Sequence, residues 1–184
     1  MQAAQPDLVT PLDAAHGTAG PRAARRLRAV AYWAFTLIIA LEMAAGALWD
    51  LLRIEFVRGV FARLGYPVYL LFILGVWKLP CAAALLAPRF PRLKEWAYAG
   101  AFFLYTGAAA SHLLAGEGAD KWVGPAVFSA FTLASFALRP DERRLGSPAA
   151  IAPVRPAAWI ATLGALVAFV VLALLTLPKG PPPP

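Results

Sequence analysis

The chain has 184 residues, of which 60% are hydrophobic and only 15% are charged. This composition excludes a soluble globule, a wholly disordered chain and a collagen-like protein, and it predicts an integral membrane protein. A single cysteine excludes a disulfide framework, and two histidines far apart in sequence leave too few ligands for a Cys/His metal site. The net charge of +7 does not indicate nucleic-acid binding, because the basic residues flank apolar segments, where membrane topology requires them.

The first 28 residues are predicted to form a disordered cytoplasmic tail, rich in Pro, Ala and Gly, which ends in a cluster of arginines. The apolar segment that follows, residues 30–52, is long enough to cross a hydrocarbon core of about 30 Å. The alternative for this region is a signal peptide cleaved near residues 45–47. The long preceding tail and the charge of Glu42 argue against that alternative.

Residues 51–64 predict a short amphipathic helix that lies along the membrane surface, with an apolar stripe on one side and charges on the other. The predicted elements after it are membrane spans at 68–87, 96–115 and 122–138, a Pro-rich linker at 146–156, a fifth span at 157–178 and a Pro-rich tail at 179–184. The sequence therefore predicts an all-α membrane protein with five transmembrane helices.

Basic residues are distributed unevenly between the two sides of these predicted spans. Four precede the first span, three lie between the second and third, and four lie between the fourth and fifth, which gives eleven on one side against five on the other. Because cytoplasmic loops carry the excess of Lys and Arg, the N-terminus is predicted to be cytoplasmic and the C-terminus to lie outside. The abundance of Arg, Ala and Pro over Lys suggests a bacterial protein, hence the plasma (inner) membrane.

Three ionisable side chains lie within predicted spans, Glu42, Lys78 and His112, and such groups are costly in a bilayer unless they are paired or functional. The helical rise places Lys78 and Tyr105 about 14 Å from the cytoplasmic ends of their spans, Glu42 about 18 Å and His112 about 24 Å. We therefore expect Glu42 and Lys78 to pair, with His112 nearer the outer boundary. The third span is richest in small residues and is expected at the centre of the bundle.

The candidate ligand-binding residues are Glu42, Trp77, Lys78, Tyr105 and His112. The hypothesis is that all five line one pocket, apolar with a few polar groups, which opens toward the outer leaflet. The alternatives are structural: Glu42 and Lys78 as an ion pair that fixes helix register, His112 as a side chain that reaches interfacial water, and the two aromatics as ordinary core residues. No haem-ligand pair, P-loop, dinucleotide fingerprint or nucleophile elbow is visible, so neither a catalytic residue nor a metal site is identified.

The segments LGYP (64–67), ILGVWKL (73–79), PRLKEWAYAG (91–100) and GAAASH (107–112) resemble the DoxX-like family of small bacterial membrane proteins. The resemblance implies a four-helix transmembrane bundle, here over residues 29–145, to which the fifth span is an addition. It implies no single activity, since relatives are associated with thiosulfate:quinone oxidoreductase subunits, with redox-stress complexes and, in distant eukaryotic relatives, with receptor assembly. The long N-terminal tail and the fifth span depart from the family pattern.

Three classes of function remain open at this point. The first is an accessory membrane subunit that binds a small apolar molecule, a quinone or a lipid, in a redox or stress context. The second is an assembly factor or chaperone that recognises partner transmembrane helices, and the third is a structural bundle without a ligand. An enzyme acting on quinones or sulfur compounds has less support, because no nucleophile, metal set or cofactor motif is visible. The expected partners are the lipid bilayer, a membrane redox complex or other membrane protein, and a second copy of the chain; the candidate cofactor is a quinone.

Overall fold

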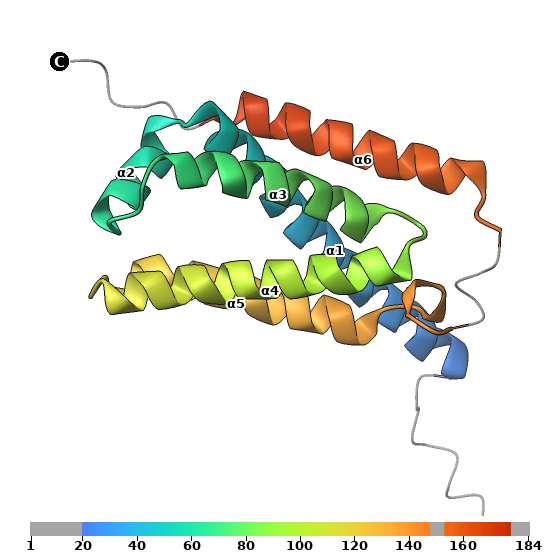
Figure 1. Cartoon of the computed structure of the whole chain (residues 1–184). Coiled ribbons are helices and arrows are strands. Elements are labelled where there is room, and N and C mark those ends of the chain that lie inside the picture. The colour runs from blue at the N-terminus through green and yellow to red at the C-terminus, as the bar shows by residue number, and fades with distance from the viewer. Residues whose placement is uncertain (1–19, 148–152, 178–184) are drawn as a thin grey trace, which may run out of the picture.

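A computed structural model describes residues 20–147 and 153–177, and its regular elements in this part of the chain are all helices (Figure 1). They are α1 (Pro21–Leu52), α2 (Glu55–Arg63), α3 (Tyr69–Leu86), α4 (Pro91–Leu114), α5 (Ala119–Leu138), the 3-10 helix η2 (Asp141–Arg143) and α6 (Pro156–Leu175). The predicted all-α fold is confirmed. Residues 1–19, 148–152 and 178–184, to which parts of the predicted tails and linker belong, lie outside the described residues.

Helix α1 is longer at its N-terminal end than the predicted span. It begins at Pro21, a favoured residue in the first turn because the N–H that proline lacks would have no helical partner there. Residues 22–28, assigned above to the N-terminal tail, are therefore helical. At the other end, Arg53 adopts a left-handed conformation with φ of 50°, which turns the chain into α2.

Among the described helices, α1, α3, α5 and α6 are long and apolar enough to cross a membrane. Helix α4 has 24 residues, but charged residues in its first turns and polar ones near its end make it less apolar. It runs antiparallel to α3 and packs along α5 (Figure 1), so it extends through the same layer as these two helices. Five spans therefore remain the expected number, since the exposed side chains of α4 include the large apolar ones of Leu93, Trp96 and Phe103.

Helix α1 occupies the centre of the bundle, because it packs against α3, α5 and α6. Its buried side chains run along most of its length: Tyr32, Thr36, Ile39, Ala40, Met43, Ala44, Ala47 and Asp50. Helix α4 packs mainly on α5 and less extensively on α3. The prediction that the third span, which is α4, lies at the centre is wrong. The small residues that permit close helix approach at the centre are the buried alanines of α1.

Helix α3 lies very close to α1 at Gly75. A Cβ atom at this position would lie 2.7 Å from Leu51 Cγ and 2.9 Å from the backbone oxygen of Ala47. Both distances are shorter than van der Waals contact, and a backbone oxygen cannot rotate away as a side chain can. The absence of a side chain at Gly75 is therefore what allows the two helices to touch.

The variant Gly75→Ala should destabilise the protein by about 1–3 kcal/mol, because the added methyl group must push α3 away from α1. The matched control is Gly124→Ala in α5, where a Cβ would meet nothing within 4 Å. Thermal unfolding of both variants in the same detergent measures the difference. Equal melting temperatures would show that α1 and α3 can separate at Gly75 without cost.

Hydroxyl groups connect three helices inside the bundle. Ser135 of α5 forms hydrogen bonds of 2.8 Å to Thr36 Oγ1 of α1 and of 2.8 Å to Tyr98 OH of α4, and all three residues are buried. In an apolar interior these groups must find partners within the protein, and here they find one another. The network fixes the register of α1, α4 and α5.

The last carbonyl groups of α3 are bound by two buried basic side chains. Lys94 Nζ donates to the carbonyl oxygens of Ala84 (2.6 Å) and Leu85 (3.0 Å), and Arg143 donates to those of Leu85 (3.0 Å) and Leu86 (3.2 Å). These oxygens have no partner within the helix, and they lie at the negative end of its dipole. Two of the basic residues counted above for topology therefore also hold the end of α3.

Helix α6 lies at the edge of the bundle, against α1 and α3 (Figure 1), as expected of an additional helix. Its contacts reach the turn between α3 and α4: Thr162 donates to the carbonyl oxygen of Leu86 at 3.2 Å, and Trp159 packs edge-to-face on Phe90 with ring centres 6.0 Å apart. Most of its other side chains are exposed and suited to contact with lipid.

Candidate functional site

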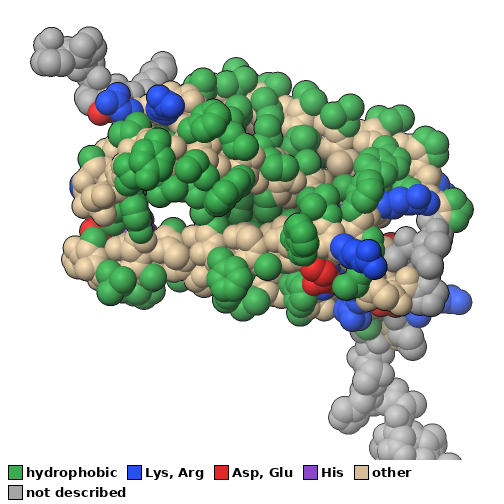
Figure 2. Space-filling model, in the orientation of Figure 1, with side chains coloured by type: hydrophobic (Ala, Val, Ile, Leu, Met, Phe, Trp, Pro, Cys, Tyr) green, Lys and Arg blue, Asp and Glu red, His purple; other side chains and the backbone are tan. Residues whose placement is uncertain are grey.

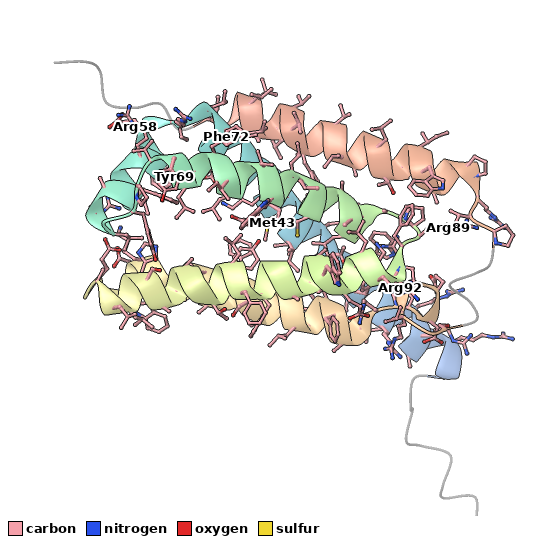
Figure 3. The ribbon with its side chains drawn as sticks, in the orientation of Figure 1. Met43, Arg58, Tyr69, Phe72, Arg89 and Arg92 are labelled. Carbon is pink, nitrogen blue, oxygen red and sulfur yellow. The ribbon has the colours of Figure 1, made fainter. Side chains whose placement is uncertain are left out.

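A cavity of about 450 Å³ lies between α3 and α4, with Met43 of α1 behind the gap between the two helices (Figure 3). The other lining residues are Leu74, Trp77, Lys78, Pro80, Cys81 and Ala84 of α3 and Leu93, Trp96, Ala97, Gly100, Ala101 and Leu104 of α4. Small-molecule sites in proteins measure about 300–1,000 Å³, so this space is large enough for a ligand.

The cavity opens sideways. Trp77 and Trp96 at its rim are 66% and 79% exposed, and the surface in Figure 2 is hollowed along the line between α3 and α4. In a bilayer this opening faces lipid. The cavity extends from Leu74 and Leu104 to Leu93, beside the turn that joins the two helices. On the predicted topology this turn lies on the cytoplasmic side, so the predicted topology and the prediction of a pocket open toward the outer leaflet cannot both hold.

Small side chains explain why this space remains unfilled. Ala84 of α3 lines it from one side, and Ala97, Gly100 and Ala101 of α4 line it from the other. At Gly100 a Cβ would meet nothing within 4 Å. The two helices are held apart rather than drawn together, since each packs mainly on another partner, α3 on α1 and α4 on α5.

Lys78 directs its ammonium group at Asp50 of α1. Its Nζ donates to Asp50 Oδ2 at 2.8 Å, and both side chains of this ion pair are largely buried. The same Nζ lies 3.0 Å from the position that a Cβ on Gly46 would occupy, so a side chain there would require the ammonium group to shift by a few tenths of an ångström. Lys78 also lines the cavity, with its ammonium group already bound by Asp50.

The predicted ion pair of Glu42 and Lys78 is wrong in its acidic partner. Glu42 accepts a hydrogen bond from Tyr105 OH, and Asp50 takes the ammonium group. The two ionisable groups are still neighbours, because Glu42 Oε1 lies 3.3 Å from the same Cβ position at Gly46. Asp50 was missed, although Glu42, Gly46 and Asp50 recur at every fourth residue and so share one face of α1.

The structure does not bring the five predicted residues into one pocket. Trp77 and Lys78 line the cavity. Glu42 and Tyr105 lie deeper in the bundle, bonded to each other, with the Tyr105 ring stacked on Phe128 at 5.3 Å between centroids. His112 belongs to a separate cluster at the other end of α4. The cavity and this buried pair are adjacent through α1 and α4, where Met43 and Leu104 line the cavity, whereas His112 takes no part in either.

The cluster around His112 joins α2 to the end of α4 and to the loop that follows it. Glu117 accepts hydrogen bonds from His112 Nδ1 and from Arg63 Nε, the latter at 3.3 Å, while Tyr66 OH and Ser111 Oγ lie 2.7 Å apart. The bond from His112, supported by Arg63, holds the pKa of Glu117 below its ordinary value. This contact therefore stabilises the fold at pH values above the ordinary glutamate pKa of about 4.3. The stabilisation is lost as the pH falls through the lowered pKa of Glu117.

The polar side chains of the cavity wall are engaged within the protein. Lys78 is bound by Asp50, and Cys81 Sγ donates to the carbonyl oxygen of Ala97 at 3.4 Å. In the part of the chain that the structure describes, no cluster of His, Cys, Asp and Glu is arranged to hold a metal ion. The chemistry that this site supports is the sequestration of apolar groups.

A family model described as the DoxX-like family matches residues 34–135. The match contains every lining residue of the cavity, from Met43 to Leu104, and it leaves α6 outside. No curated protein and no solved structure matches the chain.

Proposed function

The chain belongs to the DoxX-like family, and we propose that it is a membrane protein that binds a small apolar molecule, a quinone or a lipid, between α3 and α4. The observation that supports this proposal is the cavity of about 450 Å³, with an apolar wall and a lateral opening. Packed protein interiors contain few voids larger than a water molecule, so a space of this size facing the bilayer favours an occupant.

In this proposal the protein is an accessory subunit without catalytic chemistry of its own. The ionisable groups at and beside the cavity are engaged, Lys78 by Asp50 and Glu42 by Tyr105, which suits a binding role better than proton or electron transfer. The redox or stress context is supported by the family resemblance alone. The charge bias of eleven against five supports an N-terminus in the cytoplasm of a bacterium, with the helices in its plasma membrane.

The variant Gly100→Phe should remove the bound molecule by filling the cavity. A Cβ atom at this position meets nothing within 4 Å, and Gly100 lines the cavity, so the ring has open space to enter. The matched control is Gly107→Phe, on the same helix, which has equally open surroundings and does not line the cavity. Each protein is purified in mild detergent, and its quinones and lipids are extracted and quantified by mass spectrometry.

We expect a molecule that accompanies the wild type and Gly107→Phe and is largely lost from Gly100→Phe. Both variants must elute as the same single species in size-exclusion chromatography, so that the loss cannot be attributed to misfolding. If all three proteins carry the same molecules in the same amounts, the cavity is not a binding site and the proposal fails.

A further inference from the structure

We propose that the occupant of the cavity is a hydrocarbon chain of an anionic glycerophospholipid, whose headgroup lies at Arg92 and Arg89. This inference rests on the proposed function and deepens it by naming the class of ligand and its orientation. Three features of the site carry it: the internally satisfied polar groups of the wall, the depth of the cavity and the charge at its shallow end.

The wall favours a hydrocarbon chain over a polar group. The ammonium group of Lys78 is directed at Asp50, and Cys81 Sγ at the carbonyl oxygen of Ala97. A carbonyl or hydroxyl of a ligand placed deep in the cavity would lose its hydration without gaining these groups as partners, which is unfavourable. The polar part of the ligand is therefore expected outside the cavity.

The depth of the cavity matches one leaflet of a bilayer. Its lining residues on α4 run from Leu93 to Leu104, a rise of about 17 Å along the helix. Half of a hydrocarbon core of about 30 Å is about 15 Å. Because Leu93 lies in the first turn of α4, the cavity begins at the level of the turn and ends near the middle of the bundle. An acyl chain of one leaflet follows the same path.

The shallow end of the cavity is positively charged. Arg89 and Arg92 lie at the turn between α3 and α4 (Figure 3), and Arg92 is exposed. Trp96 on the rim is an amphipathic side chain of the kind that favours the membrane interface. Charge complementarity therefore favours an anionic headgroup over a zwitterionic one, and over a quinone, whose neutral ring gains little from an arginine.

The test uses the full chain in nanodiscs that contain equal parts of phosphatidylglycerol and phosphatidylcholine with identical acyl chains, released for native mass spectrometry. The wild type should retain phosphatidylglycerol preferentially. Arg92→Gln should lower the ratio of retained phosphatidylglycerol to phosphatidylcholine about fivefold, the effect of one basic residue near a membrane surface. Arg26→Gln, an exposed arginine on α1, is the matched control and should leave the ratio unchanged.

The outcomes separate this inference from the proposed function. Equal ratios in the wild type and in Arg92→Gln overturn the anionic lipid, even where Gly100→Phe still loses a bound molecule. A quinone found in the cavity of the wild type overturns the inference and supports the proposed function. If Gly100→Phe retains the same lipids as Gly107→Phe, both fail.

Discussion

Replacing Arg143 by Met should lower the free energy of unfolding by about 3–5 kcal/mol, because hydrogen bonds from a charged donor contribute about 1.5–3 kcal/mol each. The guanidinium is buried and donates to the carbonyl oxygens of Leu85 and Leu86 and to the hydroxyl of Tyr32. It also lies over the ring of Trp33, 4.5 Å from its centre. Methionine fills a similar volume and removes these three hydrogen bonds, while Lys94 still donates to Leu85 and Thr162 to Leu86.

Lys94 makes this prediction sharper, because it shares an acceptor with Arg143. The carbonyl oxygen of Leu85 receives a hydrogen bond from each of these two side chains. In either single variant, Lys94→Met or Arg143→Met, that oxygen keeps one donor. The double variant removes both, so its cost should exceed the sum of the single costs. Thermal unfolding of the three variants in detergent measures this coupling.

The control for both is Arg26→Gln, which removes a positive charge from the exposed start of α1 and should change stability by less than about 0.5 kcal/mol. Should Arg143→Met prove no more costly than Arg26→Gln, the arginines at this end of the bundle would act only in topology. The capping of α3 would then contribute nothing to folding.

Much of the fold can be predicted from the sequence, because uninterrupted apolar segments indicate membrane helices. Proline and glycine mark their ends, as Gly65 and Pro67 do between α2 and α3, and Pro91 does at the start of α4. The buried role of Arg143 could not be predicted in this way. It depends on η2, which brings Arg143 to the carbonyl groups at the end of α3. Residues 139–146 contain no periodic pattern from which this contact could be predicted.

The site was predicted less well for a geometric reason. Depths counted at a fixed rise per residue assume straight, parallel helices, whereas α1 crosses behind α3 and α4 at an angle (Figure 1). This tilt brings Asp50 rather than Glu42 to the ammonium group of Lys78. The cavity itself could not be predicted, because its existence depends on which small residues of α3 and α4 face one another. The sequence identified the residues that carry charge, and the packing determined their partners.

Removing the ammonium group in Lys78→Met should destabilise the protein by about 3–5 kcal/mol, the cost of leaving a buried charge without its partner. Asp50 is only 3% exposed, and its carboxylate has Lys78 at 2.8 Å. The double variant Asp50→Asn with Lys78→Met should cost much less, because the desolvation of both charges disappears together with their attraction. Thermal unfolding of the single and double variants gives the coupling between the two groups.

The matched cycle of Glu42→Gln with Lys78→Met distinguishes the observed partner from the predicted one. Glu42 is hydrogen-bonded to Tyr105. The destabilisation by Glu42→Gln should therefore add almost fully to that by Lys78→Met, and the coupling energy should be well below that between Asp50 and Lys78. A Glu42 coupling as strong as that of Asp50 would mean that both carboxylates share one ammonium group.

The same variants also test the role of the ion pair of Asp50 and Lys78 in binding. Because the ammonium group faces α1, the double variant of Asp50 and Lys78 should keep the molecule that Gly100→Phe loses. Its loss from the double variant would show that the pair takes part in binding and does more than fix the register of α1 and α3.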